Sequence, residues 1–261
     1  MVAFRCAASA ENDPEEIAII RMDKMIKDQL LPSPDEGELK MFISSQENFR
    51  KKIYPEYKAN RKQPTPVHLG ACKEYLVKNF GAQIAHGCEA DDYLATNQTK
   101  DSWIISNDKD MLQVPGNHYN PIKDQINQIS EIEGLRHFYT QLLVGDAADN
   151  IHGVAGIGKV KAQRALEGYE NEQDMFDKVR GMYNDDERLL VNGKLLWLIR
   201  QEGKLWEFPQ AYSTPDLEQK SKYMNEIALT YMGLGMTDLS ESGFPTDGLA
   251  PGEYLTEKTT Q

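Results

Sequence analysis

Apolar residues recur at helical spacing in several stretches, and short apolar runs separate these stretches from one another. The short runs end in acidic turns, as buried strands of a parallel sheet do. The predicted elements are helices over 14–31, 65–80, 130–144, 173–183 and 187–200, and strands within 39–45, 82–87 and 102–112. This alternation predicts an α/β fold with a mainly parallel central sheet flanked by helices.

The chain divides into three predicted parts. Residues 1–144 hold the alternating strands and helices of a core, and residues 145–209 form a largely helical region packed on it. Residues 210–261 contain one amphipathic stretch, 217–236, followed by a tail rich in Gly, Pro and Thr, which we expect to be frayed.

Composition narrows the class of protein. With 261 residues, 40% of them apolar, the chain can bury a core, and it has no apolar run long enough for a membrane span. The first residues lack the pattern of a secretory signal. Three cysteines without zinc-type spacing are typical of reduced thiols, so we expect a cytoplasmic protein.

The net charge of −12 argues at first against nucleic acid as a partner. The distribution of charge changes this picture, because residues 47–62 hold six basic and two acidic side chains, a local charge of +4, with two tyrosines between them. This stretch is a candidate surface for contacts with a phosphate backbone.

Three acidic clusters stand at predicted strand ends. Spacings of two in extended chain and of three on a helix place the members of a cluster on one face. The seven residues are Glu89, Asp91, Asp92, Asp108, Asp110, Asp146 and Asp149. Carboxylates gathered in one cleft repel one another unless cations neutralise them, and oxygen ligands favour Mg²⁺ or Mn²⁺. The alternative is that each cluster only caps helices.

Residues 145–166, "GDAADNIHGVAGIGKVKAQRAL", place glycines and lysines directly after two of these aspartates. The run from Gly153 to Lys159 is similar to a Walker A loop, but Val160 stands where the loop needs a hydroxyl, and no apolar strand precedes it. The better interpretation is a helical hairpin whose exposed N–H groups bind nucleic-acid phosphates, with Lys161 on the following helix.

The combination of four motifs resembles the bacteriophage 5′-3′ exonuclease and flap endonuclease family, which is related to the 5′ nuclease domain of bacterial DNA polymerase I. The motifs are "YPEYKANR" (54–61), "EADD" (89–92), "SNDKDM" (106–111) and "GDAADNIHGVAGIGKVKA" (145–162). The resemblance implies a helical arch at about 47–66 over the site. It also implies a helix-hairpin-helix element within 145–209 that binds duplex DNA, usually with a K⁺ ion.

The resemblance also assigns roles to residues. Lys58 matches the arch lysine that contacts the scissile phosphate, Arg61 assists in charge neutralisation, and Tyr57 belongs to the same motif. The alternative for Lys58 and Arg61 is that they are solvated charges. The seven carboxylates fall on the family's ligands for up to two Mg²⁺ or Mn²⁺ ions. The expected DNA-binding residues are Arg50, Lys51, Lys62, Gly153, Gly156, Gly158, Lys159 and Lys161.

Two departures from the family pattern concern metal ligands. The first strand of the family, with its Asp, has no counterpart, because the chain begins just past that point. A further aspartate position aligns with Ser45. A late start codon explains the first loss but not the serine, and both losses weaken the expected metal site.

We therefore expect a divalent-metal-dependent 5′-3′ exonuclease or flap endonuclease that hydrolyses DNA near 5′ ends. Its partners would be flaps and duplexes with a single-stranded arm, with RNA–DNA hybrids as a further substrate, and the protein would be a monomer without membrane contact. One alternative is an inactive DNA-binding relative that has lost two ligands. Another is an RNA-cutting nuclease, which the hairpin disfavours.

Overall fold

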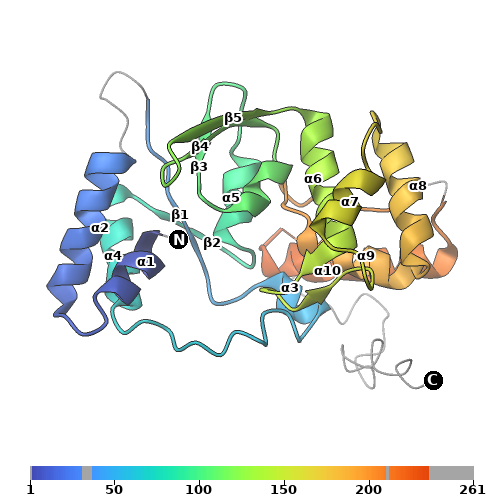
Figure 1. The fold of residues 1–261 in the computed structure, drawn as a ribbon. Helices are drawn as coiled ribbons and strands as arrows, with labels where there is room; N and C mark the ends of the chain where they lie inside the picture. Colours follow the sequence, from blue (N-terminus) through green and yellow to red (C-terminus); the bar gives the residue numbers. More distant parts are fainter. Residues whose placement is uncertain (1, 31–36, 210–211, 235–261) are drawn as a thin grey trace, which may run out of the picture.

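The computed structural model describes residues 2–30, 37–209 and 212–234. Figure 1 shows helices α1, α2 and α4 at one end of the molecule, strands β1 to β5 in the middle, and helices α6 to α9 at the other end. Within the described residues, no helix is long and apolar enough to cross a membrane. The predicted tail, which follows residue 236, lies outside the described residues.

The N-terminal part is a small helical layer on a two-stranded sheet. Its elements are α1 (Val2–Ser9), α2 (Glu15–Gln29), β1 (Phe42–Ser44), α4 (Leu69–Phe80) and β2 (Gln83–Ala85). The strands β1 and β2 are parallel, with Ile43 opposite Ile84. The three helices contact one another around a buried cluster that includes Met22, Ile26 and Cys72. Helix α4 ends where Gly81 adopts a left-handed φ of 62°.

A second sheet follows in the chain. Its elements are α5 (Ala90–Thr96), β3 (Trp103–Ile105), the 3₁₀ helix η1 (Lys109–Gln113), β4 (Gly116–Asn120) and β5 (Gln125–Ile129). Strand β4 is parallel to β3 and antiparallel to β5. In the described residues β1 does not pair with β3, so the sheets stay separate. The α/β class is therefore correct, whereas a single, mainly parallel central sheet is not what the structure shows.

The C-terminal half packs helices around a large apolar core. Its elements are α6 (Glu131–Val144), β6 (Gly145–Asp146), β7 (Ile151–His152), α7 (Lys159–Ala165), α8 (Glu172–Tyr183), α9 (Asp186–Leu196) and α10 (Pro215–Tyr231). Ser130 and Glu133 form a capping box that begins α6. The rings of Phe138, Phe176 and Trp206 pack against one another in this core.

The segment 47–66 differs from the predicted helical arch. It contains only the five-residue helix α3 (Phe49–Ile53) and a turn that ends at Asn60, and residues 61–66 are neither helix nor strand. Figure 1 shows this part of the chain running as an extended connection toward α4. The prolines at 64 and 66 lack the N–H that a helix requires of interior residues, which explains the absence of an arch helix here.

Candidate active site

A cleft of about 1630 Å³ lies against both small sheets and the acidic turns. Its wall includes all of β1 and β3, and six of the seven predicted carboxylates line it. These are Glu89, Asp91, Asp108, Asp110, Asp146 and Asp149, and the same wall contains Tyr57, Lys58 and Arg61. Segments that are far apart in the sequence thus present acidic and basic side chains to one space.

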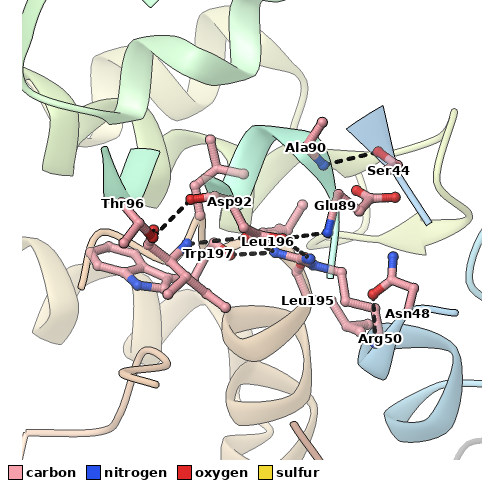
Figure 2. A network of polar contacts seen from close by, with 12 residues as sticks. Ser44, Asn48, Arg50, Glu89, Ala90, Asp92, Thr96, Leu195, Leu196 and Trp197 are labelled. Atoms are coloured by element: carbon pink, nitrogen blue, oxygen red, sulfur yellow. Dashed lines mark hydrogen bonds and ion pairs between the residues drawn. The ribbon is translucent and has the colours of Figure 1, made fainter. Parts of the chain in front are cut away.

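Local structure explains how each acidic segment reaches the cleft. Glu89 is the N-cap of α5, and the first N–H of that helix, from Ala90, donates to Ser44 Oγ at the end of β1 (2.9 Å; Figure 2). Asp108 caps η1 directly after β3, by accepting from the backbone N–H of Asp110. Asp146 ends the short strand β6, so its carboxylate follows helix α6 closely.

Asp92 does not line the cleft. Its side chain is 1% exposed and forms a two-pronged ion pair with Arg50, at 2.7 and 2.8 Å (Figure 2). It also accepts from the N–H groups of Glu89 (2.9 Å) and Ile199 (3.1 Å). This structure thus places the oxygens of Asp92 in interior hydrogen bonds rather than in the cleft, and its assignment as a metal ligand stays a prediction that this placement does not support.

Arg50 is the other member of this buried pair, and this structure does not present its side chain to DNA as predicted. Beyond Asp92, its guanidinium donates to the carbonyl oxygens of Leu195 and Trp197, each at 2.8 Å. The side chain is 1% exposed and joins α3 to α5 and to the end of α9. By contrast, Lys51 and Lys62 are exposed, and their predicted contact with DNA stays a prediction.

The unneutralised carboxylates of the cleft have perturbed acidity. Burial, together with the charges of Asp108 and Glu89, raises the pKa of Asp91 to about 6. Burial and the charges of Asp108 and Asp146 raise the pKa of Asp110 to about 7. Both shifts show negative charge that is crowded and only partly solvated, which is the electrostatic condition that favours a bound cation.

The basic residues of the "YPEYKANR" turn neutralise two further carboxylates of the cleft, Glu89 and Asp149. Lys58 Nζ pairs with Glu89 and lies 3.6 Å from Asp149, while Arg61 pairs with Asp149. The hydroxyl of Tyr57 donates to Glu89 (3.0 Å) and to Asp149 (2.9 Å). Burial alone would raise the pKa of Glu89, but Arg50 and Lys58 bring it below its ordinary value.

The carboxylates do not form a ready-made ligand shell. In the described part of the chain, no group of three or more His, Cys, Asp or Glu side chains is arranged so that it could hold a metal ion. Six of the seven carboxylates thus share one cleft, as expected, but they are not grouped tightly enough to form a metal site. Asp92 forms an ion pair with Arg50, and Glu89 and Asp149 form ion pairs with basic side chains of the "YPEYKANR" turn. Ser45 also lines the cleft, and its hydroxyl donates to the Glu47 carbonyl (2.7 Å).

The glycines between β7 and α7 fall into two groups. A Cβ on Gly153 would lie 2.4 Å from backbone atoms of residues 143–145, so this glycine permits close packing of the chain on itself. Gly156 and Gly158 are exposed, and a Cβ there would meet nothing within 4 Å. Lys159 and Lys161 are exposed as well. The structure thus places a turn between α6 and α7, while its action as a helix-hairpin-helix for DNA and K⁺ stays a prediction.

Three polar residues near the site were not among those predicted. Gln141 of α6 donates to Asp110 (2.8 Å), Asn60 donates to the Ala147 carbonyl, and Asn150 donates to the Glu56 carbonyl (3.0 Å). The two asparagines lie inside motifs that the sequence already singles out, so position in a motif was the available signal. Gln141 gave no such signal, because it lies on an ordinary amphipathic helix.

Comparison with solved structures identifies the class of fold. The T5 5′-exonuclease with bound divalent zinc ions superposes with a TM-score of 0.57 at 19% identity, covering 87% of this chain and 96% of that chain. A bacteriophage T5 flap endonuclease complex with DNA and metal ions gives a TM-score of 0.55 at 17% identity, covering 86% and 96%. The chain therefore has the fold of these phage nucleases.

The sequence establishes the family. Residues 9–140, just over half of the chain, match the 5′-3′ exonuclease N-terminal resolvase-like domain, and the chain belongs to this nuclease family. DNA polymerase I of Borreliella burgdorferi is 31% identical over 177 residues, which cover 59% of this chain and 19% of that protein. Flap endonuclease Xni of Shewanella piezotolerans is 29% identical over 168 residues, covering 57% and 66%. The match thus spans about a fifth of the polymerase.

Proposed function

We propose that the chain is a divalent-metal-dependent 5′ nuclease, which hydrolyses DNA phosphodiester bonds near 5′ ends or at flaps. The observation that carries this proposal is that one cleft brings six of the seven predicted carboxylates together with Tyr57, Lys58 and Arg61. The likeness to a flap endonuclease crystallised with DNA and metal ions supports the same activity. The proposal extends to a monomeric cytoplasmic protein that acts on DNA and on RNA–DNA hybrids.

The proposed ligands of a divalent ion are four carboxylates of the cleft, which would have to move closer together to hold one ion, because the described residues contain no ready-made ligand group. Asp91, Asp108, Asp110 and Asp146 offer oxygen ligands only, and no ion pair with Lys or Arg joins them in the described residues. Oxygen ligands and crowded negative charge suit Mg²⁺ or Mn²⁺. When bound, such an ion supplies Lewis-acid stabilisation of the phosphate and lowers the pKa of water.

The basic turn supplies the remaining charge. Lys58 is largely buried and Arg61 is more exposed, so a phosphate that enters the cleft meets Arg61 first and Lys58 deeper inside. Both side chains already form ion pairs with carboxylates. If they moved to a phosphate oxygen, they would exchange one anionic partner for another. Fixed positive charges that face developing negative charge lower the barrier of phosphoryl transfer. Tyr57, bonded to Glu89 and Asp149, keeps these two carboxylates in place.

A second candidate function is DNA binding without catalysis. Ser45 occupies a cleft position where a carboxylate is expected, and its hydroxyl bonds to a backbone carbonyl instead. Lys58 and Arg61 hold Glu89 and Asp149, as in a protein whose own cations have replaced the metal. This candidate predicts binding of flap DNA without cleavage. The RNA-cutting alternative predicts cleavage of single-stranded RNA alone.

One assay separates the three functions. A 5′-labelled flap duplex, a nicked duplex and a single-stranded RNA are incubated with Mg²⁺, Mn²⁺, Ca²⁺ or EDTA. We expect cleavage of the DNA substrates with Mg²⁺ or Mn²⁺, and its loss in Asp146→Ala. The matched control is Glu74→Ala, which removes a carboxylate of α4 that is 73% exposed and lies outside the cleft. Cleavage that survives in EDTA, or equally in both variants, refutes the proposal.

A further inference from the structure

Two turns meet at the edge of the cleft and exchange hydrogen bonds. The first turn, 54–61, contains the basic residues, and the second, 146–150, contains two of the carboxylates. At their centre, the backbone N–H of Lys58 donates to the Asp149 carbonyl (2.9 Å). Each turn contains one residue with a left-handed backbone: Lys58 in the first, with φ of 60°, and Asn150 in the second, with φ of 61°.

Asparagine side chains flank this central bond in a reciprocal arrangement. Asn60 of the first turn donates to the Ala147 carbonyl of the second, and Asn150 of the second donates to the Glu56 carbonyl of the first (3.0 Å). An amide side chain suits this task, because its NH₂ donates without adding charge next to the carboxylates. We call this pair of side chains, Asn60 and Asn150, the asparagine clasp.

We propose that the asparagine clasp positions Lys58 and Arg61 over the carboxylates of the cleft. The clasp bonds lie on both sides of Lys58, and Arg61 follows Asn60 directly in the chain. A lysine on a turn is otherwise free to move, since its side chain loses considerable rotamer entropy when it is fixed. The clasp fixes the backbone at Lys58. The ammonium group of Lys58 therefore stays at Glu89 with little further loss of conformational entropy.

The consequence for catalysis rests on the proposed function, whereas the placement of Lys58 does not. If the cleft hydrolyses a phosphodiester, a loosened turn lowers the rate of the chemical step more than it lowers DNA affinity. Positioning of a charged group acts mainly on the transition state, whose geometry tolerates little displacement. Asn60 and Asn150 are thus positioning residues, which act through Lys58 and Arg61.

The test uses the double variant Asn60→Ala/Asn150→Gly. Glycine accepts the left-handed backbone of residue 150, so the change removes the side chain without straining the turn. The matched control is Asn79→Ala/Asn184→Gly. Asn79 also donates to a backbone carbonyl from an exposed position, and Asn184 also has a left-handed backbone, with φ of 54°. Neither lines the cleft.

The first measurement is independent of activity. Brief acetylation, read by peptide mass spectrometry, compares Lys58, whose side chain is 18% exposed, with Lys222, which is 75% exposed. We expect the ratio of Lys58 to Lys222 labelling to rise about fivefold or more in the double variant, since the loss of one hydrogen bond alone changes an equilibrium by a factor of about five. The control should keep the wild-type ratio. An unchanged ratio in the double variant overturns the proposal, whether or not the wild type cleaves DNA.

The second measurement is single-turnover cleavage of the flap duplex, together with DNA affinity in Ca²⁺. We expect the cleavage rate to fall about tenfold or more and the affinity to change less than about twofold, the result of misplaced charge rather than of lost binding. A full cleavage rate in a variant whose Lys58 is newly reactive overturns the positioning role. If the double variant does not fold, Asn60→Ala alone, at an exposed side chain, gives the same two measurements. A wild type that cleaves no substrate refutes the proposed function, while the labelling ratio still decides the placement of Lys58.

Discussion

Replacing Asp92 with asparagine tests whether this residue stabilises the interior or binds metal. Asp92 accepts four hydrogen bonds, two from Arg50 and one each from the N–H groups of Glu89 and Ile199. In Asp92→Asn the charge disappears and an NH₂ group faces the guanidinium of Arg50. The variant thus leaves the buried guanidinium of Arg50 without its counterion. Hydrogen-bond donors around residue 92 also lose an acceptor.

The size of the effect follows from burial. Both side chains of the pair are 1% exposed, and removing one partner of a buried ion pair costs about 3–5 kcal/mol. For a protein of this size, each kcal/mol lowers the melting temperature by about 2–4 °C, so we expect a decrease of roughly 6–20 °C. The exposed pair of Lys78 and Glu74, 74% and 73% exposed, offers the comparison. Lys78→Ala should cost less than about 1 kcal/mol.

The assay is thermal unfolding of wild type, Asp92→Asn, Lys78→Ala and Asp146→Ala, each in EDTA and in Mg²⁺. A metal ligand gives a different result from a structural residue. Asp146→Ala should keep or raise the melting temperature in EDTA, because one of several crowded charges is removed, and it should lose the gain caused by Mg²⁺. If Asp92→Asn unfolds within about 2 °C of the wild type and loses only the Mg²⁺ response, our reasoning about the pair is refuted.

Three further predictions concern titration, charge and packing. Burial raises the pKa of Asp110 from 3.8 to about 7, so the folded state binds the extra proton. Without metal, the free energy of unfolding should therefore fall as pH rises from about 4 to 7, and it should fall less in Asp110→Asn. Chemical unfolding at several pH values measures this dependence. Equal slopes of unfolding free energy against pH in the wild type and the variant would contradict the prediction. Lys58→Ala should lower turnover by orders of magnitude with little change in DNA binding, and equal losses of both would contradict its role. Gly153→Ala should lower the melting temperature, because its Cβ would lie 2.4 Å from backbone atoms, whereas Gly158→Ala should leave it unchanged.

Periodicity predicted the long elements well. The helices expected over 14–31, 130–144 and 173–183 are α2, α6 and α8, with ends shifted by a residue or two. Strands β4 and β5 were missed. Their sequences, "GNHYN" and "QINQI", are mostly polar, and their residues are largely half-buried or exposed, so hydrophobic burial left little pattern to read. Pairing between the two strands, rather than an apolar face, defines them.

Two neighbouring residues of one motif lie in different environments, and their spacing in the sequence does not distinguish them. Asp91 and Asp92 are adjacent at the start of α5, yet the first faces the cleft and the second faces the interior. The difference arises because Arg50, from a segment that looks like an exposed basic run, reaches the interior and takes Asp92 as its partner. The different positions of the two carboxylates thus depend on Arg50, which lies 42 positions from Asp92 in the sequence. Local sequence patterns do not contain this information.

The cleft carboxylates form two sets with different electrostatic needs. Lys58 and Arg61 compensate Glu89 and Asp149, while Asp91 and Asp110 keep raised pKa values because their neighbours are also anions. A divalent ion relieves repulsion in the second set without displacing either basic side chain, so the first ion should bind there. Only a further ion, or a phosphate, would compete for the first set. In the proposed nuclease, this order would let an acidic protein accept a polyanion, because a bound metal would lower the negative charge of the cleft before Lys58 and Arg61 leave their carboxylate partners for the phosphate.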